Sequence, residues 1–373
     1  MTRRLRRSAL FAVVPVLAVA AAAYGLERGE RDSEPSAQAS AAKSYKGFGA
    51  HRWPPAGWRP YSRSSPFNRP IPNGTRAHPR SDEMVRQILS SGVPAPMVVG
   101  TAGTSYDYGH PTYYAKSTDP VYRLRPTAGW GRNAIAGRRI RIPSEARPAA
   151  GSDGHMTVVT PDGWEYDLWQ VHDKPAGGGT LSFSWGGRIR IDGDGLGDGG
   201  TASGFGNLAG MIRAQELKAG RINHALFVVL RCTSGDTSFG HGVRRGSNGS
   251  YVYPANDGDA ACAAGTPAPP MGARLQLAMS RRQIDALRAP AWQKTILRAL
   301  ARYGGYVGDT GGPGFALMFE SSAMYASFGQ PDPLVAMARS AGLREHDGMY
   351  AFDVGEGVDW ARHLRVVPPP KRR

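Results

Sequence analysis

Cysteine is scarce in the sequence, and long apolar runs and regular repeats are missing. Only two cysteines occur in 373 residues, which excludes a disulfide-dense small scaffold and a multi-cysteine zinc site. No heptad pattern or fixed-period repeat is present, which excludes coiled coils and solenoids. Glycine and proline are abundant, at 49 and 29 residues, and they interrupt most windows long enough for a helix of a bundle. We therefore expect a globular domain built from short elements.

Acidic residues are few relative to basic ones. There are 46 lysines and arginines against 30 aspartates and glutamates, a formal net charge of +16. The basic residues are scattered apart from short pairs and the C-terminal Lys371–Arg373, and none forms a basic helix interleaved with stacking aromatics. We therefore expect no nucleic-acid partner. A basic exported protein would meet anionic envelope polymers and lipid headgroups first.

The longest apolar run lies at the N-terminus. Four arginines between positions 3 and 7 precede an apolar stretch from Ala9 to Tyr24. That stretch is shorter than the roughly twenty residues of a membrane span, and the small residues at Ala20–Ala23 offer a signal peptidase site. The pattern predicts a signal peptide over 1–26, with an uncleaved membrane anchor as the alternative. Either interpretation places the rest of the chain outside the cell or in its envelope.

Composition divides the remainder into a linker, one domain and a tail. Residues 27–47 are small and polar and predict a disordered linker, residues 48–367 predict a single β-rich domain, and 368–373 form a basic tail. Short apolar runs bounded by glycine and proline predict strands from about Pro96 to Met279. The predicted fold class is mainly β, a β-sandwich or jelly-roll-like domain with a few peripheral helices.

Helix-start and helix-stop signals place the few helices. Ser81 and Asp82 are expected to cap a short helix, and a second is expected over 214–219. Ser280 and Gln283 form a capping-box pattern, and Pro290 precedes an apolar stripe that ends before Gly304. Asp332 and Pro333 predict a further helix to Ala341.

The two cysteines are Cys232 and Cys262. In an oxidising compartment an even pair predicts one disulfide, here across a segment rich in glycine, serine, asparagine and aspartate. We therefore expect a covalent link across a long irregular loop, with a catalytic cysteine as the weaker alternative.

A hairpin within 154–173 carries the clearest chemical pattern. Thr160-Pro161-Asp162-Gly163 predicts a tight turn, which would pair Val159 with Glu165, Thr157 with Asp167 and His155 with Trp169. Side chains alternate along a strand, so these polar groups and Trp169 share one face, while Met156, Val158, Tyr166 and Leu168 share the other. One face is thus apolar, and the opposite face offers two carboxylates, an imidazole and an indole.

That polar face suggests carbohydrate chemistry. A tryptophan ring stacks on a sugar, and paired acidic or imidazole groups supply general acid and base. We expect Glu165 or Asp167 to act as base or nucleophile, His155 or Asp309 as its acid partner, and Trp169 as a sugar platform. The alternatives are glycan binding without catalysis and an ordinary solvent-facing pair of strands. Asp309 precedes a glycine turn, so capping that turn is its structural alternative.

His172 and His224 are the remaining candidate substrate-binding residues. His172 ends Gln170-Val171-His172, which is similar to the Gln-Ile-His tripeptide of some β-sandwich alginate lyases, although the arginine-rich and tyrosine-lysine strands that accompany it there are missing. His224 precedes the apolar run Ala225–Leu230, which predicts a central strand. A structural histidine at the start of that strand is the alternative for His224.

Metal, phosphate and serine-nucleophile motifs are weak or missing. Asp192, Asp194 and Asp198 lie in a glycine-rich run, but Leu196 and Ser203 occupy positions where an EF-hand needs oxygen ligands. A flexible loop is the primary interpretation, with calcium as the alternative and no other cofactor expected. The sequence has no zinc-ligand spacing, no phosphate-binding loop and no Gly-x-Ser-x-Gly motif.

Several phrases together resemble one protein family. They are SPFNRPIP, DGHMTVVTPDGWEYDLWQ, LAGMIRAQELKAGRINHALFVVL, PMGARLQL and ILRALARYGGYVGDTGG, spread over roughly 64–345. In these the chain is similar to a family of exported, functionally uncharacterised actinobacterial-type proteins. The resemblance implies export and a single domain, and it implies no activity.

The sequence as a whole predicts an exported carbohydrate-active protein. We expect a glycoside hydrolase or polysaccharide lyase that acts on an envelope or environmental polysaccharide. The alternative is a non-catalytic surface protein that binds glycan or cell wall.

Overall fold

The computed structural model describes residues 45–235, 242–312 and 314–370. The predicted signal peptide or anchor, the linker up to residue 44 and residues 371–373 lie outside the described residues. Strand residues outnumber helical ones, at 24% against 16%, so the expected mainly β class is confirmed. None of the helices within the described ranges is long and apolar enough to cross a bilayer.

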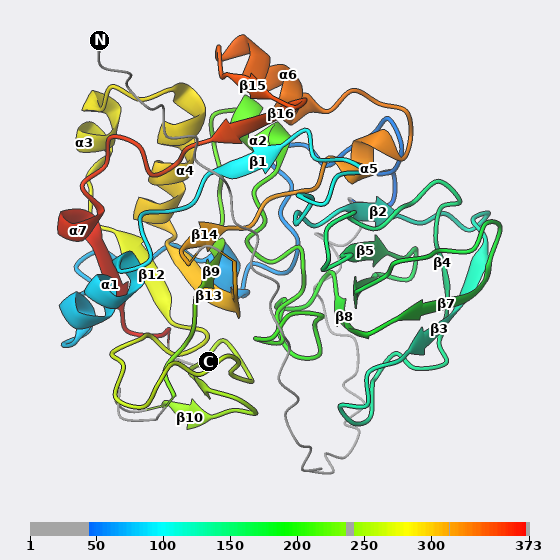
Figure 1. The fold of residues 1–373 in the computed structure, drawn as a ribbon, viewed down its shortest axis with the longest axis horizontal. Coiled ribbons are helices and arrows are strands. Elements are labelled where there is room, and N and C mark those ends of the chain that lie inside the picture. The colour runs from blue at the N-terminus through cyan, green and yellow to red at the C-terminus, as the bar shows by residue number, and fades with distance from the viewer. Residues whose placement is uncertain (1–44, 236–241, 313, 371–373) are drawn as a thin grey trace, which may run out of the picture.

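A five-stranded sheet forms the centre of the larger lobe (Figure 1). Its order is β14 (Ala316–Leu317), β9 (Leu226–Leu230), β13 (Gly305–Thr310), β12 (Arg274–Leu277) and β17 (Leu364–Val367). Strands β9 and β13 run parallel, and the other pairs are antiparallel. Four of the five residues of β9 are buried, so the predicted central strand at this position is confirmed.

A smaller β lobe, residues 112–191, lies beside it. One sheet contains β2 (Thr112–Tyr114), β5 (Met156–Val159), β6 (Trp164–Trp169) and β8 (Trp185–Arg190), in that order. A second contains β4 (Arg139–Arg141), β3 (Val121–Pro126) and β7 (Gly179–Phe183). Tyr113, Tyr122, Leu168 and Leu181 belong to a buried cluster separate from the main one. The buried hydrophobic side chains thus form two clusters.

The helices surround the larger lobe and begin largely where their capping signals lie. They are α1 (Ser81–Leu89), α2 (Ala214–Lys218), α3 (Arg281–Ala286), α4 (Ala291–Arg302), α5 (Ala323–Ala326), α6 (Pro333–Ser340) and α7 (Trp360–His363). The capping box of Ser280 and Gln283 is present, and Asp332 caps α6. Helix α1 differs: its N-cap is Arg80, and the Ser81 hydroxyl instead accepts a hydrogen bond from Val366 N–H.

The remaining elements are short. Strands β1 (Met97–Val99), β16 (Met349–Phe352) and β15 (Glu345–His346) form a small sheet, β10 (Arg244–Arg245) pairs with β11 (Ser250–Tyr251), and Pro66–Asn68 is a 3₁₀ turn. The predicted disulfide between Cys232 and Cys262 is present. It ties the two ends of the segment that carries β10 and β11, which we call the stapled loop (232–262).

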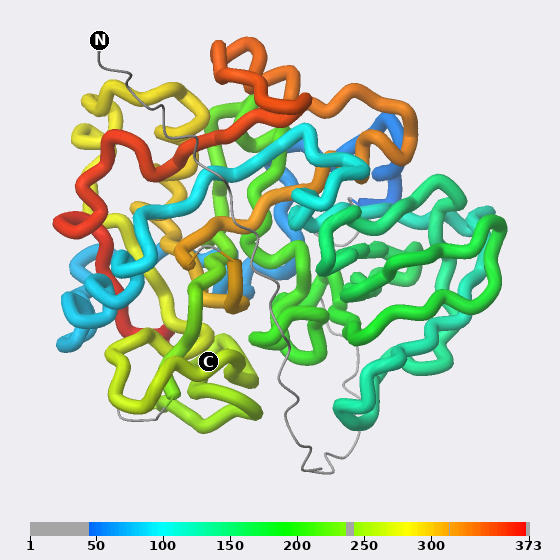
Figure 2. Tube along the Cα trace, viewed as in Figure 1, coloured from blue at the N-terminus to red at the C-terminus, as the bar shows by residue number. Residues whose placement is uncertain are grey.

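An N-terminal strap, residues 45–71, contacts both lobes (Figure 2). Its aromatic residues are buried except for the half-buried Trp53. The Tyr61 hydroxyl reaches the β lobe, while Phe67 packs edge-on against Phe205 and Tyr306. Ala225 N–H donates to the Phe67 carbonyl. The strap therefore helps to hold the lobes together, and the junction between them is where polar side chains gather.

Candidate functional site

The hairpin of β5 and β6 has the predicted register. Val159 lies opposite Glu165, and Thr157 lies opposite Asp167. Thr160 N–H donates to the Trp164 carbonyl, and Gly163 closes the turn with a positive φ of 87°, a conformation that favours glycine. The turn residues therefore determine which side chains share a face, as the sequence indicated.

The polar face of this hairpin is covered. Glu165 and Asp167 have no exposed surface, because a glycine-rich cover segment, residues 195–208, lies across them. The Tyr61 hydroxyl donates to Glu165 Oε2 at 2.6 Å, and Leu208 N–H donates to Oε1 at 2.9 Å. The expectation of an exposed polar face is therefore corrected: in this structure neither carboxyl group contacts solvent, so neither can contact a polysaccharide.

Asp167 joins the hairpin to the same cover segment. Its Oδ2 accepts from Asn207 N–H at 3.2 Å and from Gly200 N–H at 3.3 Å, and its Oδ1 accepts from the Thr157 hydroxyl at 3.2 Å. Burial raises the pKa of Glu165 well above its usual range, and it raises the pKa of Asp167 to about 6. The charge of Asp167 also contributes to the raised pKa of Glu165, so the ionisations of the two carboxyl groups depend on each other.

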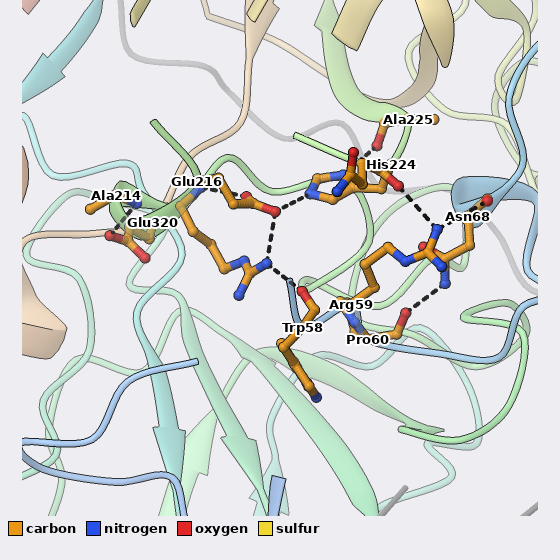
Figure 3. Close-up of polar contacts among 11 residues, drawn as sticks. Trp58, Arg59, Pro60, Asn68, Ala214, Glu216, His224, Ala225 and Glu320 are labelled. Atoms are coloured by element: carbon orange, nitrogen blue, oxygen red, sulfur yellow. Dashed lines mark hydrogen bonds and ion pairs between the residues drawn. The ribbon is translucent and has the colours of Figure 1, made fainter. Parts of the chain in front are cut away.

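His224 belongs to a buried ion network in the larger lobe (Figure 3). Its Nε2 lies 3.0 Å from Glu216 Oε1, which also accepts from Arg213 Nη2 at 2.7 Å. Burial disfavours the charged form of Glu216, but Arg213 and His224 outweigh it, so the pKa of Glu216 is lowered. The His224 side chain is 4% exposed. The predicted substrate-binding role is thus replaced by a structural one.

A second group of polar side chains lies where the lobes meet, and we call it the junction site: Asp153, His155, Asp309 and His110. Asp153 and His155 come from the turn before β5, and Asp309 from the end of β13. Gln170 N–H donates to the Asp153 carbonyl and Val171 N–H to that of Gly154. These bonds fix the turn against the end of β6.

Asp309 is positioned by an irregularity in its strand. The register against β9 shifts between Val307 and Asp309. Such a shift, like a β-bulge, changes the direction of the Asp309 side chain. Thr310 N–H donates to Asp309 Oδ1 at 2.8 Å. Burial raises the pKa of Asp309 to about 7, and the charges of Asp153 and Asp259 add to that rise. Asp259 lies in the stapled loop, so charges from two other segments of the chain act on Asp309.

Two histidines complete the junction site. The ring centroids of His110 and His155 are 4.3 Å apart, and His155 Nε2 is 3.9 Å from Asp153 Oδ2. Burial lowers the pKa of His155 to about 4, and it lowers that of His110 well below its usual range. Both rings are therefore neutral at pH 7. His110 Nδ1 lies 3.3 Å from the Asn207 carbonyl.

Three tryptophans border the junction site. Trp130, 44% exposed, stacks on Trp169 with centroids 5.7 Å apart and planes 29° apart. It lies equally close to Trp185 at a steeper angle. Trp169 Nε1 donates to Asp153 Oδ1 at 3.4 Å, so this tryptophan cluster adjoins the catalytic candidates. The expected sugar platform at Trp169 is therefore part of a larger aromatic surface.

The other predicted residues lie elsewhere. His172 is exposed on the segment after β6. Arg190 binds the Asp192 carboxylate through two hydrogen bonds, and Asp194 Oδ1 accepts from Leu196 N–H. Over the described part of the chain, no group of three or more histidine, cysteine, aspartate or glutamate side chains could hold a metal ion. Asp192 is thus engaged by arginine rather than available to calcium.

Sequence reasoning named His155, Trp169 and Asp309 but missed their neighbours. Asp153 stands two residues before His155, so strand alternation could have placed it near the same edge. His110 and Trp130 lie in glycine-flanked segments without periodicity, and no local signal brings them to the site. Comparison with protein-family models, curated proteins and solved structures finds no match.

Proposed function

We propose that the protein is an exported glycoside hydrolase whose catalytic groups are Asp309 and Asp153. The observation that supports this most is the pKa of Asp309, which burial and the charge of Asp153 raise to about 7, together with the hydrogen bond from the Trp169 indole to Asp153 beside the exposed Trp130. Glycoside hydrolases need one protonated and one ionised carboxyl group on either side of the scissile bond. The junction site offers two carboxyl groups from two different lobes, and the pKa of one of them, Asp309, is raised.

Each residue then has a chemical role. Protonated Asp309 donates its proton to the glycosidic oxygen as the bond to the leaving sugar breaks. The Asp153 side chain, 41% exposed, attacks the sugar or activates a water molecule from the other side. The indole N–H of Trp169 positions Asp153, and the tryptophan cluster stacks on a neighbouring sugar ring.

The test measures cleavage of a polysaccharide panel by residues 44–373. The panel contains arabinan, peptidoglycan and uronic-acid polymers, and it is read by new reducing ends and by absorbance near 235 nm. We expect reducing ends without that absorbance, and we expect Asp309→Asn and Asp153→Asn each to lower the rate by about a hundredfold or more. Asp173→Asn, an exposed aspartate elsewhere on the β lobe, is the matched control and should retain the wild-type rate.

Other outcomes distinguish the alternatives. Absorbance together with reducing ends indicates a polysaccharide lyase, which leaves an unsaturated uronate. Polymer binding without cleavage, lost in Trp130→Ala and unchanged in Asp309→Asn, indicates a non-catalytic glycan-binding protein. Wild-type rates in both aspartate variants would refute the proposed pair.

A further inference from the structure

The outer sheet of the β lobe carries an unusual concentration of arginine. Arg123 and Arg125 on β3 and Arg139 on β4 are exposed. Arg132 and Arg138, in the loop between these two strands, are also exposed. We call these five residues the arginine face. Figure 1 shows β3, β4 and β7 on the side of the β lobe that lies away from the five-stranded sheet.

The arginine face is not neutralised by the protein. No salt bridge between described residues includes any of its five members. Arg123 and Arg139 even lie directly opposite each other across the β3–β4 pair, an arrangement that is unfavourable for like charges. Because these two arginines lie opposite each other with no carboxylate partner among the described residues, their side chains can bind an anion from outside the protein.

A pocket adjoins this face. It has a volume of about 510 Å³ and is lined by Arg132, Arg138, Asn133 and small residues of the 126–138 segment. Gly137 lies beside the Arg123 guanidinium, so the pocket and the sheet arginines are neighbours. The same segment carries Trp130 onto Trp169 and Trp185. The cationic surface is therefore connected to the tryptophan cluster and, through Trp169, to Asp153.

We propose that the arginine face binds the carboxylates of an acidic polysaccharide whose chain crosses the tryptophan cluster into the junction site. This rests on the proposed function and names its substrate class: a polymer rich in uronic acid rather than a neutral glycan. An arginine guanidinium can form paired hydrogen bonds to a carboxylate. Arginines that alternate along one face of a strand can contact successive carboxylates of an extended polysaccharide. Continuity with the tryptophan cluster and its exposed member Trp130 favours a polysaccharide over a nucleic acid or a lipid surface.

The test compares binding of polygalacturonate and neutral arabinan by the wild type and by Arg123→Gln/Arg139→Gln. We expect polygalacturonate to bind more tightly than arabinan at low salt, and we expect the double variant to bind it roughly fivefold to tenfold more weakly. The control, Arg244→Gln/Arg245→Gln, removes the same charge from exposed residues of β10 and should stay within about twofold of the wild type.

The proposal is overturned if both variants bind polygalacturonate alike. It is also overturned if only DNA or phosphatidylglycerol vesicles bind in an Arg123- and Arg139-dependent manner. Its failure is distinguishable from that of the catalytic proposal, because cleavage is scored separately with Asp309→Asn. If Asp309→Asn loses cleavage but the Arg123→Gln/Arg139→Gln variant binds polygalacturonate like the wild type, this inference alone is refuted. If the arginine variant binds more weakly but Asp309→Asn cleaves at the wild-type rate, the catalytic proposal alone is refuted.

Discussion

Glu165 and Asp167 are the clearest case of residues whose chemistry is set by their surroundings. Both carboxyl groups are fully buried, and both have raised pKa values, chiefly because burial disfavours the charged forms. Four hydrogen-bond donors from the strap and the cover segment surround the pair, namely Tyr61, Leu208, Asn207 and Gly200. We therefore assign the pair a structural role that depends on pH.

The raised pKa values of Glu165 and Asp167 predict that the unfolding free energy falls as pH rises. A carboxyl group whose pKa is raised by folding stabilises the native state below its unfolded pKa, and this contribution is lost as pH rises through the folded pKa. Glu165→Gln removes one of the two ionisations, so the unfolding free energy of this variant should fall less steeply than that of the wild type between pH 4 and pH 8. Denaturant unfolding at several pH values measures this slope.

The control for that measurement is Glu145→Gln, an exposed glutamate on the same lobe, which should follow the wild-type slope. Parallel curves for Glu165→Gln and the wild type would contradict the assigned buried, protonated state.

At the scale of elements, the cover segment 195–208 holds the hairpin through very close backbone contacts. A Cβ atom at Gly206 would lie 2.3 Å from the Tyr61 hydroxyl and 2.8 Å from Glu165 Oε1. The residue therefore has to be glycine for reasons of space, because any side chain would push apart the Tyr61–Glu165 hydrogen bond.

Gly206→Ala should destabilise the fold by about 1–3 kcal/mol, the usual cost of overpacking. Gly57→Ala is the matched control, because nothing lies within 4 Å of a Cβ at that position, and it should be close to neutral. Thermal unfolding of the two variants compares them directly. Equal melting temperatures would show that the cover segment moves freely on the hairpin.

The local elements could be predicted from the sequence, but the covering of the polar face could not. The Thr160–Gly163 turn determines the hairpin register, and the capping residues Ser280 and Asp332 mark helix starts, because these signals act over a few residues. Strand alternation shows only that Glu165 and Asp167 share a face. Whether that face meets solvent depends on hydrogen bonds from a segment about forty residues away.

At the scale of the whole molecule, the candidate site exists only because two lobes meet. Asp153 and Asp309 are separated by more than 150 positions, yet the charge of Asp153 contributes to the raised pKa of Asp309. The sequence indicated Asp309 and His155 as acid partners from their residue types. Strand alternation could have placed Asp153 near His155, but its electrostatic effect on Asp309 could not be predicted, because no local pattern encodes contacts between lobes.

The stapled loop adds an electrostatic element to this site. Asp259 lies within the segment closed by Cys232 and Cys262, and its charge contributes to the raised pKa of Asp309. Its Oδ1 accepts from Ala260 N–H, a contact that an asparagine oxygen can keep. Asp259→Asn therefore changes the charge near Asp309 while retaining the local geometry.

The pH dependence of turnover in the wild type and Asp259→Asn tests the assignment of Asp309 most directly. A general acid must be protonated, so the rate should fall as pH rises through the pKa of Asp309, about 7. Removing the Asp259 charge lowers that pKa, and the alkaline limb of the variant should move to lower pH. An alkaline limb at the same pH in both proteins would contradict the role of Asp309 as the acid.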